Sequence, residues 1–391
     1  MSVLQDCHTV EDFAALARRR LPDYAYDFIA GGAGRELALA RNQHSLDQIA
    51  LVPRLGQQVQ HPDLSLRCLG QNFALPFGIA PLGLCGLVHP QADLMLARCA
   101  QRLRMPYILS STSNLPLAQL SQALGEAPWF QFYAPQAPQA AAQALARAEQ
   151  HGCPVLIVTA DVAAPGKRLR DVRHRLQMPL RWNARLLAAT LKHPLWAWRR
   201  LRAGAISFPN LAMPEEDCRT WPLQRLMAWQ TGGALDWDAL AQIRARWPRK
   251  LVLKGVLCAQ DALRARALGF DAVYLSNHGG RQLDAAPAPV QMLPGIAAQG
   301  LPAAELLLDS GIRSGEDIAK ALALGAGAIF LGRPFLYALA AGGEAAVERL
   351  VELLRQDLAR SMALLGIPSA QQAGEWRTQE GGAVYNWRTA T

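Results

Sequence analysis

Eight short apolar segments alternate with stretches of helical periodicity, and this alternation constrains the fold of the 391-residue chain more than any other feature. Most segments are at most eight residues long, rich in Leu, Ile, Val or aromatic side chains, and closed by Gly, Ser, Asn or Asp, which is typical of a parallel strand buried on both faces. Their ranges are 76–81, 106–111, 129–133, 154–161, 251–255, 271–277, 305–311 and 328–332. Eight strand–helix units, preceded by a helical extension over about residues 9–40, predict an α/β fold of the (β/α)8 TIM-barrel type.

A doubly wound parallel sheet is the alternative architecture. The chain has no complete G-x-G-x-x-G after its first strand and no G-x-x-x-x-G-K-[ST], which weakens this alternative. The strand starts lie about 20–35 residues apart, except that nearly 100 residues separate 154 from 251. A connection this long inside a compact barrel is usually either functional or disordered. We therefore expect a single domain over 1–391 with a long insertion after the fourth strand.

The insertion also carries the excess charge of the protein. The chain holds 40 Lys and Arg against 31 Asp and Glu, and residues 172–214 contain eight of the basic residues and none of the acids. The eight are Arg173, Arg175, Arg181, Arg185, Lys192, Arg199, Arg200 and Arg202. Without them the counts are 32 and 31, so the positive charge does not cover the whole surface as it does in a histone-like protein.

The same insertion mixes its basic residues with Leu and with Trp182, Trp196 and Trp198. Basic side chains interleaved with aromatic ones are typical of a segment that lies on an anionic membrane surface, and 178–210 is too charged to cross a bilayer. The alternative is an ordinary solvated, partly helical loop. We expect no nucleic-acid partner, because there is no recognition motif and the rest of the chain is nearly neutral.

Other classes of protein are excluded by simple counts. The seven Cys are scattered without a C-x-x-C pair, which argues against a disulfide framework or a zinc ribbon, and no metal-ligand spacing such as H-E-x-x-H appears. The first 22 residues carry acids early and have no continuous apolar core, so we expect no signal peptide. The chain contains no run of about 18 apolar residues, so we expect no transmembrane helix. These features favour a location in the cytoplasm.

Polar side chains follow nearly every predicted strand, at the end where a barrel carries its active site. They are Ser110, Gln131, Tyr133, Thr159, Asp161, Lys254, Ser276, His278, Arg281, Asp309 and Arg333. His278 and Arg281 stand in the densest block, SNHGGRQLD (276–284). A neutral imidazole takes up a proton near pH 7 and a guanidinium holds a carboxylate, so this pair favours an enzyme that deprotonates an organic acid. A purely structural histidine is the alternative.

Gly-rich turns with arginines follow the last two strands, in DSGIR (309–313) and LGR (331–333). This pattern matches the usual phosphate site of a barrel, although the glycines alone would also permit tight turns. Lys254 ends a strand predicted to be buried, so its charge requires an anionic cofactor ring or a buried carboxylate.

These residues resemble the FMN-dependent 2-hydroxy acid oxidase and dehydrogenase family. The resemblance extends from about Leu4 to about residue 365, and SNHGGRQLD matches the family's active-site signature. Supporting motifs are YDFIAGGAG (26–34), APLGLCG (80–86), LSSTSN (109–114), WFQFY (129–133), LVLKG (251–255) and ALALGAGAIFLGR (321–333). LSSTSN and TADVAAPGKRLRD (159–171) are most similar to the membrane-associated mandelate dehydrogenase branch, and APLGLCG is similar to the quinone-linked L-lactate dehydrogenases.

The resemblance implies a role for each candidate residue. His278 would be the catalytic base, oriented by Asp161. Arg281 and Arg168 would clamp the substrate carboxylate with help from Tyr26, and Tyr133 would hydrogen-bond the substrate hydroxyl. The implied FMN site consists of Ala80, Pro81, Ser110, Gln131, Thr159, Lys254, Ser276, Asp309, Gly311, Arg313, Gly332 and Arg333. Of these, Gly311, Arg313, Gly332 and Arg333 would hold the phosphate. The resemblance also implies a homotetramer.

Three positions distinguish the chain from some relatives, and the last two of them bear on substrate and acceptor. Leu169 stands where relatives usually have Glu after the carboxylate-binding Arg168, so the ion pairs of this loop are expected to differ. Gly83 occupies a site that is often Ala in the oxidases and Gly in the dehydrogenases, which favours a dehydrogenase. Thr112 stands where some relatives carry a bulky aromatic, which favours a larger substrate side chain.

We therefore expect a peripheral membrane flavoenzyme on the cytoplasmic face of the inner membrane. It would oxidise an (S)-2-hydroxy acid, mandelate-like first and L-lactate second, and pass electrons to the quinone pool. A soluble oxidase that uses O2 is the nearest alternative. A non-redox FMN barrel such as the type 2 isopentenyl diphosphate isomerase, and a non-catalytic interaction protein that keeps the barrel, are the others.

Overall fold

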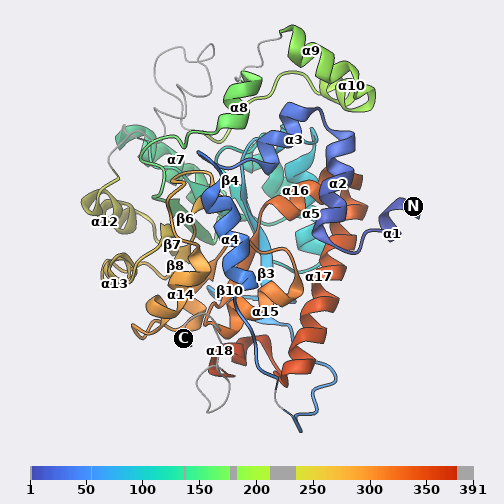
Figure 1. Ribbon diagram of the computed structural model, residues 1–391. Helices are drawn as coiled ribbons and strands as arrows, with labels where there is room; N and C mark the ends of the chain where they lie inside the picture. The colour runs from blue at the N-terminus through green and yellow to red at the C-terminus, as the bar shows by residue number, and fades with distance from the viewer. Residues whose placement is uncertain (1, 54, 136–137, 177–182, 212–234, 377–391) are drawn as a thin grey trace.

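The computed structural model describes residues 2–53, 55–135, 138–176, 183–211 and 235–376, and its centre is a closed barrel of parallel strands (Figure 1). The strands are β3 (Phe77–Leu82), β4 (Tyr107–Ser110), β5 (Trp129–Phe132), β6 (Val155–Thr159), β7 (Lys250–Val256), β8 (Ala272–Leu275), β9 (Leu306–Leu308) and β10 (Ala328–Leu331). They run in the order β10-β3-β4-β5-β6-β7-β8-β9 and coincide with the eight predicted segments. The TIM-barrel prediction is confirmed, and the closure excludes a doubly wound sheet.

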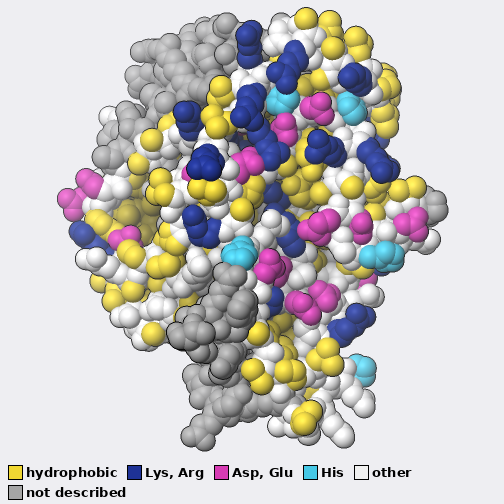
Figure 2. All heavy atoms as spheres, in the orientation of Figure 1, with side chains coloured by type: hydrophobic (Ala, Val, Ile, Leu, Met, Phe, Trp, Pro, Cys, Tyr) yellow, Lys and Arg dark blue, Asp and Glu magenta, His cyan; other side chains and the backbone are white. Residues whose placement is uncertain are grey.

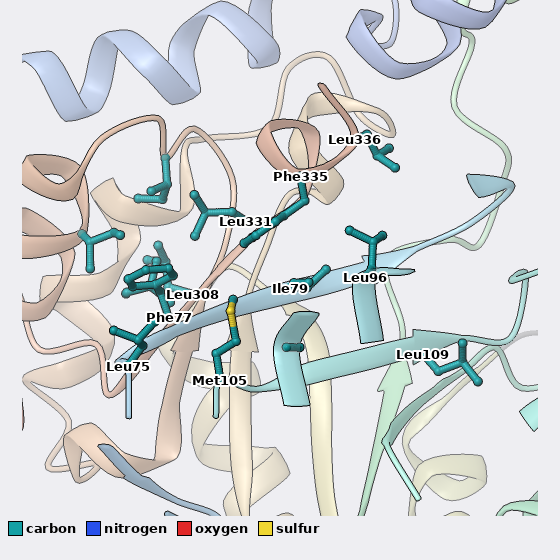
Figure 3. Close-up of a cluster of buried hydrophobic side chains, with 14 of the residues drawn as sticks. Leu75, Phe77, Ile79, Leu96, Met105, Leu109, Leu308, Leu331, Phe335 and Leu336 are labelled. Atoms are coloured by element: carbon teal, nitrogen blue, oxygen red, sulfur yellow. The ribbon is translucent and has the colours of Figure 1, made fainter. Parts of the chain in front are cut away.

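The pleat of the strands divides the apolar side chains into two buried clusters. In β10, Ala328 and Phe330 join a cluster inside the barrel, whereas Ile329 and Leu331 join the cluster between barrel and helices. The other strands alternate in the same way, because successive side chains of a strand point to opposite faces. Figure 3 shows part of the outer cluster, where Phe77 of β3 lies among side chains from neighbouring strands.

Helices follow most strands and cover the outside of the barrel. They are α5 (Ala92–Arg102), α6 (Leu117–Leu124), α7 (Pro138–Gln150), α12 (Trp237–Arg246), α13 (Ala259–Ala267), α14 (Pro289–Ala297), α15 (Gly315–Ala323), α16 (Arg333–Gly342), α17 (Glu344–Leu365) and α18 (Ala373–Trp376). The expected N-terminal helical part consists of α1 (Ser2–Gln5), α2 (Val10–Arg20), α3 (Asp23–Ala30) and α4 (Leu37–Asp47). Thr9 caps α2 in a capping box with Asp12, and Pro22, which has no backbone N–H, stands between the end of α2 and the start of α3.

A two-stranded hairpin closes the barrel at the N-terminal end of its strands. Sequence analysis did not predict it. β1 (Leu66–Cys68) and β2 (Gln71–Phe73) pair antiparallel, and the two residues between them, Leu69 and Gly70, have φ values of 48° and 83°. Two left-handed residues match the twist of a tight hairpin. Leu66 and Cys68 pack into the inner cluster, so the hairpin plugs this end.

The insertion after β6 forms three helices in its described part, α8 (Leu169–His174), α9 (Ala184–Leu191) and α10 (Pro194–Arg202). Figure 1 shows them beyond α3 at one end of the molecule. Their inner side is anchored, because the Trp196 indole donates to the Leu87 carbonyl at 2.9 Å and the Tyr24 hydroxyl lies 3.0 Å from Thr190 Oγ1. Arg181 and Trp182 of the basic segment, and its end at 212–214, lie outside the described residues. No helix in the described ranges combines the length and apolarity needed to cross a bilayer.

Candidate active site

The inward positions at the C-terminal ends of the strands are polar, in contrast to the apolar layers below. Ser110, Gln131 and Thr159 end three neighbouring strands and are all buried. The Ser110 hydroxyl donates to Gln131 Oε1 at 2.8 Å, and Gln131 Nε2 donates to Thr159 Oγ1 at 2.9 Å. This chain of hydrogen bonds satisfies the polar groups and fixes their orientation toward the mouth of the barrel.

Lys254 continues this ring from β7, and its side chain is almost completely buried. Its ammonium lies 3.1 Å from Asp309 Oδ2 and donates to the Ser276 hydroxyl at 2.6 Å. Ser310 in turn donates to the other oxygen of Asp309 at 2.8 Å. The buried charge therefore has the carboxylate partner that its position requires.

One cavity gathers most of the predicted site residues at this end of the barrel. Those that line it are Ala80, Pro81, Gln131, Tyr133, Thr159, Arg168, Lys254, His278, Arg281, Asp309, Gly311, Arg313, Gly332 and Arg333. Ser110, Ser276 and Asp161 do not line it and lie directly behind lining residues, to which they are hydrogen-bonded. Tyr26 is the one predicted residue that the structure places elsewhere.

His278 and Asp161 form a partly buried pair at the edge of the cavity. His278 Nδ1 lies 3.2 Å from Asp161 Oδ1, which leaves Nε2 as the nitrogen for chemistry. Burial by itself would raise the pKa of Asp161, but the charge and hydrogen bond of His278, together with Lys254, hold it below its usual value. Asp161 thus stays ionised beside the imidazole and stabilises the ring once it gains a proton.

A glycine makes room for this pair. Gly255, directly after Lys254, has a φ of 105°, and an added Cβ would lie 2.6 Å from Cβ of Asp161. Only glycine meets both demands, the left-handed backbone and the close approach. The glycine of the LVLKG motif therefore serves the position of Asp161.

The loop that carries His278 is held from α4. His278, Gly279 and Gly280 all have positive φ values, so the loop turns sharply. Asn277 and Asn42 exchange two side-chain hydrogen bonds of 2.6 and 2.9 Å, and both residues are buried. This reciprocal amide pair fixes the strained loop at its start. Sequence analysis did not single out Asn42.

Two arginines and Tyr133 line the same cavity as the histidine. Burial, then the charges of Arg168 and Arg333, lower the pKa of Arg281 well below its usual range. Burial, then the charge of Asp161, raise the pKa of Tyr133, which keeps its hydroxyl protonated. Cations brought together in a partly buried cavity favour an anionic ligand, and a carboxylate accepts two hydrogen bonds from a guanidinium.

The C-terminal turn of α3 holds the arginines in place. One guanidinium nitrogen of Arg281 donates to the carbonyls of Phe28 and Gly31, at 2.7 and 2.9 Å. Arg333 donates to the carbonyls of Ile29 and Gly31, at 3.0 and 2.8 Å. The last carbonyls of a helix lack intrahelical partners and carry partial negative charge, so they suit nearby cations.

The expectation that Tyr26 helps to bind the carboxylate is not supported by its position. Tyr26 stacks on Tyr337 at 6.0 Å between ring centroids and does not line the cavity. Phe28 does line it, and the guanidinium carbons of Arg281 and Arg168 lie 5.0 and 5.9 Å from the centre of its ring. Residues two positions apart on a helix point about 200° apart, so only one of them can face the cavity. The aromatic face of Phe28 replaces the hydroxyl that we expected.

A phosphate cradle lies on the other side of the cavity. Helix α16 begins at Arg333, and its N-cap Gly332 has no side chain to satisfy the first N–H groups. Arg313 and Arg333 line the cavity next to this helix end, and burial lowers the pKa of both. Helix N–H groups and two guanidiniums suit a phosphate, so the donor set fits the phosphate of FMN. Lys254 and Gln131 line the same cavity and would be candidates to contact the ring system of bound FMN.

Phe208 is a lining residue that sequence analysis missed, because the insertion was interpreted only as a surface segment. It comes from the end of the insertion, which is fixed to the rim of the barrel. The Asn210 amide accepts from the Leu117 N–H at 2.8 Å, and the Asn114 amide donates to the Ser207 carbonyl at 2.8 Å. The insertion therefore contributes an apolar wall to the cavity as well as an outer surface.

Several known proteins are similar to this chain in sequence and structure. The family described as FMN-dependent dehydrogenase matches residues 17–379. The (S)-mandelate dehydrogenase of Pseudomonas putida is 38% identical over 365 residues, which cover 93% of this chain and 92% of that protein. An L-lactate dehydrogenase of Xanthomonas campestris pv. campestris is 36% identical over 366 residues, which cover 92% and 94%.

Among solved structures, the crystal structure of the monotopic membrane protein (S)-mandelate dehydrogenase matches with a TM-score of 0.88 and 37% identity, over 94% of this chain and 98% of that one. A mandelate oxidase structure matches with a TM-score of 0.78 and 31% identity, over 94% and 97%.

Proposed function

This chain belongs to the FMN-dependent dehydrogenase family, and from that membership we propose that it oxidises an (S)-2-hydroxy acid with a large apolar side chain and delivers the electrons to membrane quinone. The observation that carries the proposal is that His278, paired with Asp161, lines the same cavity as Arg168 and Arg281. A base that shares a cavity with two cations suits a substrate whose carboxylate is held while its carbinol loses a proton.

The residues of the cavity have separate roles in the proposed reaction. Oxidation of the carbinol to a ketone removes two electrons and two protons, and bound FMN would supply the acceptor of the electron pair and of one of the two protons. Arg281 and Arg168 hold the carboxylate and fix the carbinol against the base. His278 takes one proton at Nε2, and the ionised Asp161 stabilises the resulting imidazolium. Tyr133, whose raised pKa keeps its hydroxyl protonated, would hydrogen-bond the substrate oxygen.

The walls of the cavity support an aryl or branched substrate. Phe28, Leu84 and Phe208 line it together with the small residues Gly83 and Thr112. An apolar wall beside a space free of bulky side chains favours a hydrophobic substituent over the methyl group of lactate. Mandelate-like acids are therefore the first candidates and L-lactate the second.

The choice of dehydrogenase over oxidase is supported by Gly83. A Cβ added at this position would collide with Thr112 Oγ1, so the two residues are matched in size. Gly83 was expected for a dehydrogenase, and the (S)-mandelate dehydrogenase relative carries this activity in its name.

The substrate proposal is tested by anaerobic reduction of the bound flavin with a panel of acids. We expect kcat/KM for (S)-mandelate to exceed that for L-lactate by about tenfold or more, because the larger apolar group gains burial. (R)-Mandelate is the matched control and should leave the flavin oxidised. A larger kcat/KM for L-lactate would reverse the order of the candidates. Release of peroxide in air at the rate of substrate turnover would assign the chain to the oxidases.

The membrane role rests on the outer face of the insertion. Five apolar side chains of α9 and α10 are strongly exposed, namely Leu187 (51%), Leu191 (70%), Leu195 (59%), Trp198 (54%) and Leu201 (82%). Figure 2 shows hydrophobic side chains with Lys and Arg at the end of the molecule where α9 and α10 lie. Exposed leucines with interspersed cations suit an anionic lipid surface. We place the protein on the cytoplasmic face of the inner membrane, where this surface brings the cavity close to quinone; the tetramer stays a prediction.

Removing this apolar face should release the protein from membranes. We expect the triple variant Leu187→Ser, Leu191→Ser, Leu201→Ser to bind vesicles at least a hundredfold more weakly, since each buried leucine contributes about 1.5–3 kcal/mol. Flavin reduction by the substrate should be unchanged, because the three side chains point away from the cavity. Vesicle flotation measures the first effect and stopped-flow absorbance the second.

The matched control carries Leu55→Ser, Leu263→Ser and Leu364→Ser, three leucines that are exposed elsewhere on the surface. It should float with vesicles as the wild type does. Equal binding by both triple variants would rule out the insertion as the lipid-binding face. Substitution is preferable to deletion of 178–210, because deletion would also remove Phe208 from the cavity wall.

A further inference from the structure

A second cavity lies between the N-terminal helices and the insertion, and the mechanism above does not use it. It is an open groove of about 570 Å³, within the size range of small-molecule sites. Residues from α2, α3, α8 and α9 line it, including five arginines, His174 and three acids. We call it the arginine groove and define it by Arg18, Arg35, Arg170, Arg173, His174 and Arg185.

The floor of the arginine groove is neutralised internally. Arg170 makes a bidentate pair with Glu36, with nitrogen–oxygen distances of 2.7 and 2.6 Å, and also contacts Asp27 at 3.0 Å. The other oxygen of Asp27 lies 2.7 Å from His174 Nε2. Two of the three acids, Glu36 and Asp27, are therefore paired with Arg170 and His174 and are not available to other cations.

The rim of the groove keeps an excess of positive charge. Arg18, Arg35, Arg173 and Arg185 are exposed there, and Asp23 is the remaining acid, which leaves three more cations than anions. Arg18 lies over the Tyr26 ring at 5.5 Å, and Arg185 donates to the Arg173 carbonyl at 3.1 Å. Within the described ranges, the structure gives Arg35 and Arg173 no ion pair. Four guanidiniums around a hollow form a site for an anion with several oxygens.

The groove shares helix α9 with the apolar face. Leu186 and Thr190 of α9 are buried, Leu187 and Leu191 are exposed, and Arg185 lines the groove on the flank. A molecule with an anionic head and apolar tails would match both surfaces at once. A soluble anion would use only the groove.

From this arrangement we propose that the arginine groove binds the phosphate headgroup of an anionic glycerophospholipid. The inference rests on the membrane attachment proposed above and assigns it a specific lipid contact. The proposal predicts that arginine binds the lipid better than lysine does at these positions, which nonspecific electrostatic attraction would not produce. The reason is that guanidiniums recognise phosphate by directed, bidentate hydrogen bonds, whereas an ammonium acts as a point charge.

The test therefore keeps the charge and changes the geometry. The full-length holoenzyme with Arg18→Lys and Arg173→Lys should bind vesicles of phosphatidylcholine with phosphatidylglycerol about tenfold more weakly than the wild type. The control Arg199→Lys with Arg202→Lys makes the same exchange on α10, outside the groove, and should bind as the wild type does. Flavin reduction measured on the same samples shows that each variant is folded.

Each result separates the two proposals. A wild type that does not bind these vesicles at all would overturn the membrane role itself. A groove variant that binds as well as the α10 variant would overturn the headgroup site and leave the membrane role standing. Soluble glycerol phosphate is the third arm, measured by the shift in Tm. If millimolar glycerol phosphate stabilises the wild type as much as the vesicles do, the groove binds free phosphates and the lipid assignment is wrong.

Discussion

Replacing His278 by Gln is expected to slow flavin reduction by (S)-mandelate about 10³- to 10⁴-fold, the upper part of the range for loss of a general base. Gln retains a hydrogen-bonding group of similar size but cannot accept the proton at a neutral pH. The proton would then have to leave directly to water, which lacks the basicity and the fixed position of the imidazole. The rate of anaerobic bleaching in a stopped-flow spectrometer measures this loss directly.

The control for this substitution is His44→Gln, which makes the same exchange at an exposed position on α4, outside the cavity. It should leave the rate unchanged. The FMN content of both variants should equal that of the wild type, because His278 is not among the groups that form the phosphate cradle. A His278→Gln variant that bleaches as fast as the wild type would support the alternative of a barrel kept for a non-catalytic purpose.

Replacing Arg281 by Met is expected to lower kcat/KM for the hydroxy acid about 10²- to 10³-fold, as expected for loss of one partner of a buried charge pair. The carbonyls of Phe28 and Gly31 hold the guanidinium of Arg281 in a fixed position. A water molecule or another side chain would not reproduce that position in the variant. The decisive readout compares the acid with its methyl ester, which lacks the negative charge. The variant should lose the preference for the acid over the ester.

Two further variants distinguish binding from support of the fold. Arg281→Lys keeps the charge but not the paired donors, so its loss should be intermediate. Arg168→Met removes the more exposed arginine, whose side chain is 36% accessible, and should have a smaller effect than Arg281→Met. If acid and ester are affected equally by Arg281→Met, the arginine only maintains the structure and does not hold the carboxylate.

The strands and the residues at their ends were predictable because their signals are local. Each apolar run shows its strand directly, and polar residues stand out where a run ends. The parallel barrel then brings Asp161 and His278 together although they are 117 positions apart. Closure of the barrel converts eight separate patterns into one site, which is why the alternation was more informative than any single motif.

The features that could not be predicted depend on contacts between distant segments. The position of Phe28 rather than Tyr26 depends on the rotation of a short helix about its axis, which eight residues do not determine. Asn42 contacts the His278 loop from a helix that the sequence places far away. The hairpin of β1 and β2 left a signal in the Leu69–Gly70 turn, but its strands are too short for an alternating pattern to stand out.

The hairpin that closes one end of the barrel also determines the route by which reactants enter and leave. With Leu66 and Cys68 packed below the inner cluster, the barrel has its opening at the other end, beside Arg168 and the insertion. The hydroxy acid that supplies the electrons and the quinone proposed to accept them must then use the same opening. We therefore expect the acid and the quinone to use this opening in turn, with the oxo acid leaving before the quinone binds. Under the proposed membrane attachment, quinone would reach this opening from the lipid, and the charged hydroxy acid would reach it from the adjoining water.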